Sequence, residues 1–345
     1  MHYLITGGAG FIGSHLADAL LADGHHVHAL DNLSTGTLRN IAHLKDHDRF
    51  SLTVGNVLDY HTMEQAVQTC DRIVHLAAAV GVKRVMEEPV ETIRTNIGGT
   101  ENVLQLAHYH DKPAVIASTS EVYGKAMQKD ADLDALSETD DWTLGAPSKR
   151  RWAYASSKAM DEFLAYAYHD EYDLPVTSIR FFNTVGPRQS GRYGMVIPTF
   201  VQQARAGEDI RVFGDGTQTR CFTHVSDAVR AVTGLLDCAS AAGEVYNVGN
   251  TDEISINDLA ERIRTLTGSS SDIVHIPYEE VYGPGFEDMQ RRTPDLTKIH
   301  EAVGYTPQHS TDDILSDVIE HFEAEEETSR SGDSSLAEEM EAFRS

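Results

Sequence analysis

Short apolar runs alternate with longer stretches of helical spacing over the first half of the chain. The apolar runs predict strands at Tyr3–Thr6, Val27–Leu30, Ser51–Val54, Ile73–Leu76, Ala114–Ser118 and Val176–Arg180. The amphipathic stretches predict helices that begin near Phe11, Tyr60, Val90 and Tyr154, with a short one near Leu38. Strands that alternate with helices predict an α/β fold with a doubly wound parallel sheet, whose ligands gather at the carboxyl ends of the strands.

The second half has a different texture, with shorter strands and more turns after Phe181. It predicts helices at Pro198–Ala206, Val225–Leu236, Ile256–Leu266 and Leu296–Ala302, and a buried strand at Val245–Val248 that returns to the main sheet. We therefore expect a first domain of residues 1–180 to which 225–250 return, and a smaller α/β substrate lobe of 181–224 and 251–322. Residues 323–345 are rich in Glu and Ser, which predicts a frayed acidic tail with a weak helix at Leu336–Phe343.

The first thirteen residues, MHYLITGGAGFIG, join a strand to a helix through closely spaced glycines. Gly7 permits a tight turn, Gly10 lets the backbone approach a ligand, and Gly13 lets the helix lie close to the strand. The free N–H groups of the helix start then suit a pyrophosphate. Asp31 ends the second strand about twenty residues later, where its carboxylate can accept hydrogen bonds from a ribose and repels a 2′-phosphate. This order of strand, glycine turn, helix, strand and acidic residue predicts a Rossmann-type domain that binds NAD rather than NADP.

Composition narrows the class of protein. The chain has 345 residues, 41% of them hydrophobic, which is enough for a Rossmann domain and a smaller lobe. We expect no membrane span, signal peptide, disulfide framework or metal site, and a reducing cytoplasm as the location. The net charge is −26, which disfavours nucleic-acid partners. Abundant carboxylates with few lysines favour a halophilic protein, and an ordinary acidic protein is the alternative.

Two groups of residues carry candidate chemistry. Tyr154 and Lys158 stand one helical turn apart in YASSK, where an ammonium and a bound nicotinamide cation favour the phenolate. Such a phenolate can act as a general base on a sugar hydroxyl. The strand that ends in Ser118 is followed by Thr119, Ser120 and Glu121, which places hydroxyl groups in the expected ligand crevice. In isolation either group also fits ordinary turn or surface chemistry.

The chain resembles the extended short-chain dehydrogenases/reductases, in the group of nucleotide-sugar epimerases and dehydratases. The matching motifs are TGGAGFIG (Thr6–Gly13), DNLSTG (Asp31–Gly36), VHLAA (Val74–Ala78), TNIGGTENVL (Thr95–Leu104), STSEVYG (Ser118–Gly124), YASSK (Tyr154–Lys158), RFFNTVGP (Arg180–Pro187), GDGTQTRCFTHVSD (Gly214–Asp227) and YNVGN (Tyr246–Asn250). The resemblance implies a Rossmann domain that binds NAD and a small lobe that binds a UDP- or dTDP-sugar.

The resemblance also implies site residues. The catalytic residues would be Thr119, Ser120, Glu121, Tyr154 and Lys158. The cofactor would contact Gly7, Gly10, Phe11, Ile12, Gly13, Asp31, Asn32, Asn56, Val57, Leu76, Ala77, Ala78, Asn96 and Lys158, although the family usually has Asp where Asn56 stands. The nucleotide sugar would contact Asn183, Arg188, Arg192, Val196, Val212, Arg220 and Arg292. A homodimer would form through two helices, near Val90–His108 and Tyr154–Asp170.

Within this group we expect a UDP-sugar 4-epimerase that acts through a transient 4-keto sugar, on UDP-glucose/galactose or UDP-glucuronate. Arg188 and Arg192 in the substrate loop favour this reading, since a held carboxylate resists loss. Arg150, Arg151 and Trp152 before the catalytic tyrosine also depart from the common decarboxylase pattern. The alternative is a UDP-glucuronate decarboxylase, which carries a similar Thr-Ser-Glu and an Arg in a motif similar to QRR. A 4,6-dehydratase is disfavoured because Ser120 stands where dehydratases have Asp. A non-catalytic NAD-binding regulator is disfavoured because both Tyr154 and Lys158 are present.

Overall fold

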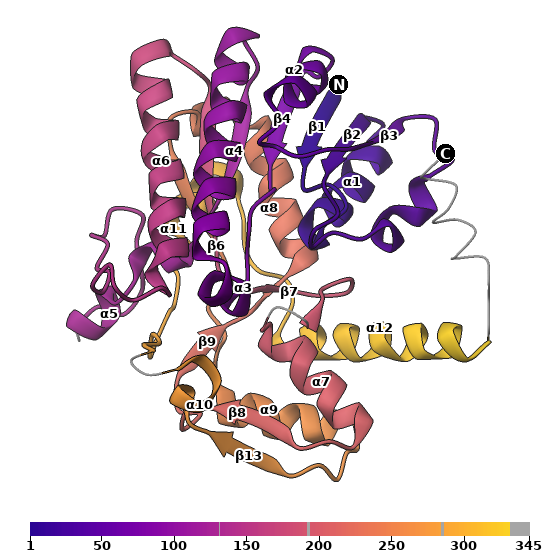
Figure 1. Ribbon diagram of the computed structural model, residues 1–345, viewed down its shortest axis with the longest axis vertical. Coiled ribbons are helices and arrows are strands. Elements are labelled where there is room, and N and C mark those ends of the chain that lie inside the picture. The colour runs from indigo at the N-terminus through magenta and orange to yellow at the C-terminus, as the bar shows by residue number, and fades with distance from the viewer. Residues whose placement is uncertain (131, 192–193, 284–285, 332–345) are drawn as a thin grey trace.

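A seven-stranded parallel sheet forms the centre of the molecule, which was analysed as a computed structural model (Figure 1). The structure describes residues 1–130, 132–191, 194–283 and 286–331. The strand order is β11-β6-β5-β4-β1-β2-β3, and every neighbouring pair is parallel. The strands are β1 (His2–Thr6), β2 (His26–Asp31), β3 (Phe50–Val54), β4 (Arg72–His75), β5 (Ala114–Thr119), β6 (Val176–Phe181) and β11 (Val245–Val248). The predicted α/β fold is confirmed.

Helices cover both faces of this sheet. One face carries α2 (Tyr60–Gln68), α4 (Pro89–Tyr109) and α6 (Trp152–Tyr172), and the other carries α1 (Phe11–Ala22), α8 (Val225–Asp237) and α11 (Thr297–Val303). Alternate residues of a strand enter opposite cores, since Leu4 packs with the first group of helices and Tyr3 and Ile5 with the second. These buried runs are apolar on both sides, as strands of a parallel sheet must be.

A smaller lobe lies against the carboxyl ends of the strands (Figure 1). Its elements are α7 (Val196–Ala206), β8 (Ile210–Phe213), β9 (Thr219–Cys221), β12 (Glu253–Ser255), α9 (Ile256–Leu266), β13 (Ile273–Ile276) and α10 (Tyr278–Tyr282). The strands β8 and β13 pair in parallel, whereas β9 and β12 pair antiparallel. The short strands β7 (Thr184–Val185) and β10 (Thr223–His224) pair with each other where the chain passes between the two parts.

Several short elements complete the fold. They are η1 (Leu38–Leu44), α3 (Val82–Glu87), η2 (Ser120–Tyr123), α5 (Ala126–Lys129) and η4 (Ala239–Ala241). The helix α3 and the turn η2 both follow sheet strands and contribute to the cleft described below. Among the helices of the described residues, none combines the length and the apolar character that crossing a membrane requires.

The acidic segment differs from our expectation at its start. Helix α12 (Thr311–Ser331) continues through the residues that we expected to fray. Its first half buries Ile314 and Leu315 in the core of the lobe, and its acidic second half pairs Glu323 and Glu326 with Arg205 of α7. The buried first half anchors the helix, and the ion pairs with Arg205 hold its acidic second half, although that segment has few apolar residues. The weak helix predicted at Leu336–Phe343 lies outside the described residues.

Candidate active site

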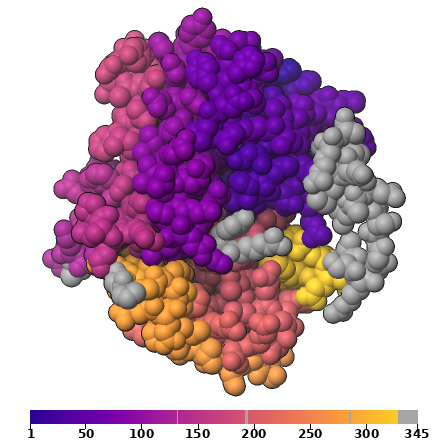
Figure 2. Space-filling model, in the orientation of Figure 1, coloured from indigo at the N-terminus to yellow at the C-terminus, as the bar shows by residue number. Residues whose placement is uncertain are grey.

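A cleft of about 1100 Å³ lies between the carboxyl ends of the sheet strands and the lobe. In Figure 2 the two parts face each other across the middle of the molecule. The cleft begins at the turn after β1 that contains Gly7, Gly10 and Gly13, here called the glycine bend. It passes the ends of β2, β4 and β5 and reaches α10 in the lobe. This is the position where open α/β sheets hold their ligands.

The glycine bend leaves no room for side chains. A Cβ atom on Gly13 would lie 2.2 Å from the carbonyl oxygen of Gly7, and Gly7 itself has a φ of +74°. The Asp31 carboxylate accepts hydrogen bonds from the backbone N–H groups of Ala9, at 3.0 Å, and Leu33, at 2.8 Å. Burial raises the pKa of Asp31, and these backbone donors oppose the shift. Asp31 thus holds the bend in shape at the edge of the cleft.

Most of the expected cofactor residues line the cleft: Gly7, Gly10, Phe11, Ile12, Gly13, Asp31, Asn32, Val57, Leu76, Ala77, Ala78 and Lys158. Asn96 and Asn56 lie behind its wall. Asn96 is fully buried, accepts a hydrogen bond from the backbone N–H of Ala79 at 2.8 Å and donates one to Ser157 Oγ at 3.0 Å. The Asn56 side chain accepts from the backbone N–H of Leu58 at 3.0 Å. Both asparagines shape the backbone that forms the cleft.

All five expected catalytic residues line the same stretch of the cleft. Thr119, Ser120 and Glu121 continue from the end of β5, and Tyr154 and Lys158 face them from α6. Burial raises the pKa of the Tyr154 phenol, the Glu121 carboxylate adds to the rise, and a hydrogen bond with Thr119 opposes it. The Lys158 Nζ atom lies 2.6 Å from Asp161 Oδ2, so the lysine ammonium is paired with a carboxylate of the same helix.

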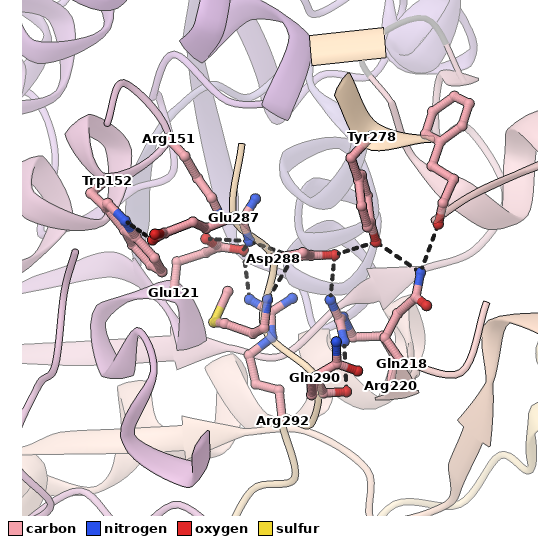
Figure 3. Close-up of polar contacts among 12 residues, drawn as sticks. Glu121, Arg151, Trp152, Gln218, Arg220, Tyr278, Glu287, Asp288, Gln290 and Arg292 are labelled. Carbon is pink, nitrogen blue, oxygen red and sulfur yellow. Dashed lines mark hydrogen bonds and ion pairs between the residues drawn. The ribbon is translucent and has the colours of Figure 1, made fainter. Parts of the chain in front are cut away.

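A group of buried charges, here called the arginine cage, closes the cleft beside Glu121 (Figure 3). It consists of Glu121, Arg151, Arg220, Asp288 and Arg292. The Glu121 carboxylate lies 2.6 Å from Arg292 and 3.4 Å from Arg151. Asp288 lies 2.9 Å from Arg151 and 3.1 Å from Arg220. Tyr278 of α10 donates a hydrogen bond to Asp288 at 3.0 Å.

The charge balance of the cage favours an anionic ligand. Three guanidinium groups face two carboxylates, which leaves one positive charge. The Nε atoms of Arg151 and Arg292 are buried and have no hydrogen-bond partner among the described residues. Burial alone would raise the pKa of Glu121, but the guanidinium groups of Arg151 and Arg292 hold it below its usual value. Glu121 is therefore ionised, and the cage retains donors for a further anion.

The expected substrate residues divide between cleft and core. Asn183, Arg188, Val196, Arg220 and Arg292 line the cleft, whereas Val212 is fully buried in the lobe core and its neighbour Phe213 lines the cleft instead. An ion pair of 2.8 Å joins Arg188 to Asp18 of α1. Arg192 lies outside the described residues.

Arg151, Asp288 and Tyr278 were absent from our list of site residues. Arg151 directly precedes α6 and stands three residues before Tyr154, so the helical spacing could have indicated that the two side chains lie on the same side. Asp288 and Tyr278 lie far along the chain from the catalytic motifs, and their local sequence carries no pattern that distinguishes them from surface residues. Their position depends on how the lobe folds back over the sheet.

Comparison with known proteins identifies the family. The family model described as GDP-mannose 4,6 dehydratase matches residues 4–318. The chain belongs to this family of extended short-chain dehydrogenases/reductases. A family member from Bacillus cytotoxicus, UDP-N-acetyl-alpha-D-glucosaminuronate decarboxylase, is 45% identical over 92% of this chain and 97% of its own.

Two further relatives span the chemistry of the family. UDP-glucuronic acid decarboxylase 1 of Danio rerio is 36% identical over 93% of this chain and 72% of its own. The structure of UDP-glucuronic acid 4-epimerase from Bacillus cereus, in complex with UDP-glucuronic acid and NAD, is 28% identical and covers 94% of this chain and 99% of its own, with a TM-score of 0.83. The family fold thus carries decarboxylases and epimerases on closely similar frames.

Proposed function

We propose that this protein is an NAD-dependent decarboxylase of a UDP-hexuronate. The observation that carries the proposal is the ionised Glu121 in contact with Arg292 and Arg151, beside Tyr154 in the cleft. If the 4-hydroxyl of a bound hexuronate faced Tyr154, the substrate carboxylate would lie beside these paired carboxylate and guanidinium groups. The similarity to two decarboxylases that act on UDP-hexuronates supports the same reading.

The residues at the glycine bend fit NAD. A ligand backbone can approach Gly7, Gly10 and Gly13 because no Cβ atom intrudes, and the start of α1 offers backbone N–H groups to a pyrophosphate. Asp31 stands 6% exposed at the end of β2 beside Asn32, where it would hold the adenosine ribose. Bound there, NAD would supply the hydride acceptor and donor that the chemistry at C4 of the sugar needs.

Tyr154 moves the proton at the sugar 4-hydroxyl. Its phenolate takes this proton as hydride leaves C4, and the product is a 4-keto hexuronate. The hydroxyl of Thr119 lies beside the phenol and holds it in line through a hydrogen bond. Because burial raises the pKa of the phenol, Tyr154 keeps the proton that it has taken and donates a hydrogen bond to O4.

The carboxylate then leaves from a β-keto acid. The bond between C5 and C6 breaks, carbon dioxide departs, and the electron pair moves to form an enolate with its negative charge on O4. Tyr154 and Thr119 stabilise that charge because both hydroxyls lie at O4 in this pose. A proton from water adds to C5, hydride returns to C4, and Tyr154 gives its proton back to O4, which leaves a UDP-pentose.

Glu121 keeps the guanidinium groups from trapping the substrate carboxylate. An arginine pair without a counter-ion would bind a carboxylate tightly and oppose its departure. In the cage, Glu121 lies 2.6 Å from Arg292 and competes for its donors. We infer that the substrate carboxylate is positioned by Arg151 and Arg292 but is held loosely enough to leave.

Our sequence-based preference for a 4-epimerase rested on Arg188 and Arg192, and on Arg150, Arg151 and Trp152 before the catalytic tyrosine. Arg188 is joined to Asp18 by an ion pair of 2.8 Å, which reduces its capacity to hold a substrate carboxylate. Arg192 contributes no observation because it lies outside the described residues. The support for the epimerase is therefore weaker than that for the decarboxylase, and epimerisation is kept as an outcome of the experiment. The dehydratase remains disfavoured because Ser120 is not an acid.

We also propose that the division into an NAD domain and a nucleotide-sugar lobe holds.

We further propose that the protein forms a homodimer. The helices α4 and α6 pack side by side and expose large apolar side chains. Val90, Ile93 and Tyr109 on α4 and Met160, Phe163 and Tyr172 on α6 are all exposed in the single chain. An apolar face of this kind is suited to a second copy of the chain.

The test is incubation of the purified protein, supplied with NAD, with UDP-glucuronate, UDP-N-acetylglucosaminuronate and UDP-glucose in separate reactions. Product masses and proton NMR spectra distinguish the possible reactions. We expect loss of carbon dioxide from at least one hexuronate and no change in UDP-glucose. An unchanged mass with an inverted C4 centre would establish the epimerase instead, and loss of water would establish the dehydratase.

A further inference from the structure

A buried ion pair lies behind the catalytic lysine. Lys158 and Asp161 stand one turn apart on α6, with 2.6 Å between Nζ and Oδ2. The side chains are 2% and 0% exposed, respectively. Lys158 lines the cleft, whereas Asp161 does not, so the carboxylate contacts the lysine from the side away from any ligand.

The other titratable groups described at this part of the site are uncharged or already paired. His75 faces Lys158 from β4, but burial lowers the pKa of His75 to about 3, so the ring is uncharged at neutral pH. The neighbouring Glu162 is joined to Arg180 at 2.7 Å. Glu121, at the other end of the site, is paired with Arg292.

The remaining neighbours of the pair are uncharged. From α4, the Thr100 hydroxyl faces Asp161, and Asn96 bonds to Ser157 of α6. From β5, Ser118 donates its hydroxyl hydrogen bond to Glu162, and Thr119 contacts the phenol of Tyr154. Among the described residues, Asp161 is the carboxylate that forms an ion pair with Lys158.

We propose that Asp161 is a positioning residue that keeps Lys158 protonated and fixed beside Tyr154 and the cofactor ribose. The part of this proposal that concerns turnover rests on the proposed function, because it takes Tyr154 as the base. The pairing itself is a property of the protein without any ligand. Asp161 does not line the cleft, so it would act on the reaction only through Lys158.

Lys158 needs a partner because a buried charge without a counter-ion costs free energy. A buried ammonium without a counter-ion loses its proton several pH units early, and a buried carboxyl retains its proton correspondingly late. Burial raises the pKa of the Asp161 carboxyl, and the Lys158 ammonium opposes that rise. On this proposal the attraction between the two groups keeps the pair ionised, so loss of either charge should neutralise its partner.

The direct test follows the protonation of Lys158 in the cofactor-free protein. The chain has eight lysines, so ¹³C-lysine labelling gives few NMR signals, and Lys158→Met identifies the one of interest. In Asp161→Asn we expect the midpoint of this signal to fall by at least about two pH units relative to the wild type. The control, Asp170→Asn, removes the same charge from an exposed position of α6 and should leave the midpoint unchanged. An equal midpoint in the wild type and in Asp161→Asn would overturn the proposal.

A second variant covers the case in which Asp161→Asn does not fold. In Lys158→Met, the Asp161 carboxyl loses its cation and should be protonated at neutral pH. Infrared difference spectra should then show the carbonyl stretch of a protonated carboxyl that the wild type lacks. If that band is absent, Asp161 has another counter-charge and the proposed mutual dependence is wrong.

Turnover gives a separate readout. In Asp161→Asn we expect kcat to fall at least tenfold with little change in the KM for the nucleotide sugar, and the acidic limb of the pH profile to move to higher pH. A limb that moved to lower pH would show that Lys158 had kept its charge without Asp161, which contradicts the proposal. If the wild-type protein turned over no UDP-hexuronate, the proposed function would fail, whereas the two ligand-free measurements would still decide the role of Asp161.

Discussion

At the scale of single residues, Tyr154 combines two opposing influences. Burial raises the pKa of its phenol, which hinders its action as a base when no cofactor is bound. The hydrogen bond with Thr119 lowers that pKa, and a bound nicotinamide cation would lower it further. The reactive state is therefore expected to form only when the cofactor is in place.

The first prediction concerns this hydrogen bond. Because Thr119 lowers the pKa of Tyr154, Thr119→Val should raise it and move the acidic limb of the kcat profile to higher pH. We expect a loss of roughly 10- to 100-fold in kcat at neutral pH. Thr119→Ser keeps the hydroxyl and should restore the profile. A limb that stays in place in Thr119→Val would show that the hydroxyl does not tune the phenol.

The second prediction concerns Glu121. In Glu121→Gln the cage gains one net positive charge, so it should bind the substrate carboxylate more tightly and release it more slowly. We expect kcat for decarboxylation to fall about 100-fold or more and KM to fall or stay constant. Glu287→Gln is the matched control, because Glu287 pairs with Lys125 outside the arginine cage. Equal losses in both variants would remove the special role that we assign to Glu121.

At the scale of elements, the sequence predicted the parts of the fold that local pattern determines. The strands β1 and β2 and the helices α1 and α6 begin within a few residues of the expected positions, because apolar periodicity and the glycine bend mark them. The lobe strands β8, β9, β12 and β13 were not predicted, since their short lengths carry little periodicity. Helix α12 was not predicted, and its second half lies in the segment that we expected to fray. That half is held by Arg205, a contact that no local pattern reveals.

The candidate site was predictable to a similar degree. Residues next to a motif, such as Thr119 and Tyr154, came together in the cleft because strand ends and the start of α6 meet at one edge of the sheet. Asp288 could not be found in this way. Its place beside Arg151 depends on a turn of the lobe that returns from a distance of more than one hundred residues along the chain.

The third prediction concerns the turn between β1 and α1. A Cβ atom on Gly13 would lie 2.2 Å from the Gly7 carbonyl oxygen, so Gly13→Ala must displace the helix from the strand. We expect a loss of about 1–3 kcal/mol in the free energy of unfolding, together with weaker NAD binding measured by calorimetry. Gly234→Ala, in helix α8, meets its nearest atom at 3.4 Å and should have little effect or stabilise the protein slightly. Equal effects of the two substitutions would contradict this account.

At the scale of the whole molecule, the buried His75 and the half-buried His15 link stability to pH. Burial lowers the pKa of His75 to about 3 and that of His15 to about 4. The unfolded chain therefore binds protons that the folded chain does not bind between these values and about 6.5. Their contribution to stability is complete above about pH 6.5 and is lost as the pH falls toward 4 and then 3.

The fourth prediction follows from that sign. The free energy of unfolding, measured by urea titration, should fall between pH 7 and pH 5, with each of these two histidines adding a slope of up to about 1.4 kcal/mol per pH unit. In His75→Gln the slope of the unfolding free energy against pH should be smaller by the contribution of one histidine. This difference in slope does not depend on the absolute stability of the variant. His61→Gln, at an exposed position of α2, is the control and should keep the wild-type slope. An unchanged slope in His75→Gln would show that His75 is protonated in the folded state.

The net charge of −26 gives a fifth prediction. Repulsion among surface carboxylates opposes the compact state, and salt screens it over about 10 Å at 0.1 M. We expect the melting temperature to rise steeply as KCl increases from low concentration to the molar range. A sucrose series serves as the control for general exclusion effects. A melting temperature that is independent of KCl would contradict the prediction of a halophilic protein.

The central claim is that one cleft oxidises C4 of a UDP-hexuronate, releases its carboxylate and returns the same hydride. The most direct measurement uses a substrate labelled with deuterium at C4 and with ¹³C at C6, incubated with the protein and unlabelled NAD. We predict that ¹³C leaves as carbon dioxide while deuterium remains at C4 of the pentose product. A product that keeps its ¹³C, or a pentose that has lost its deuterium to solvent, would contradict the account.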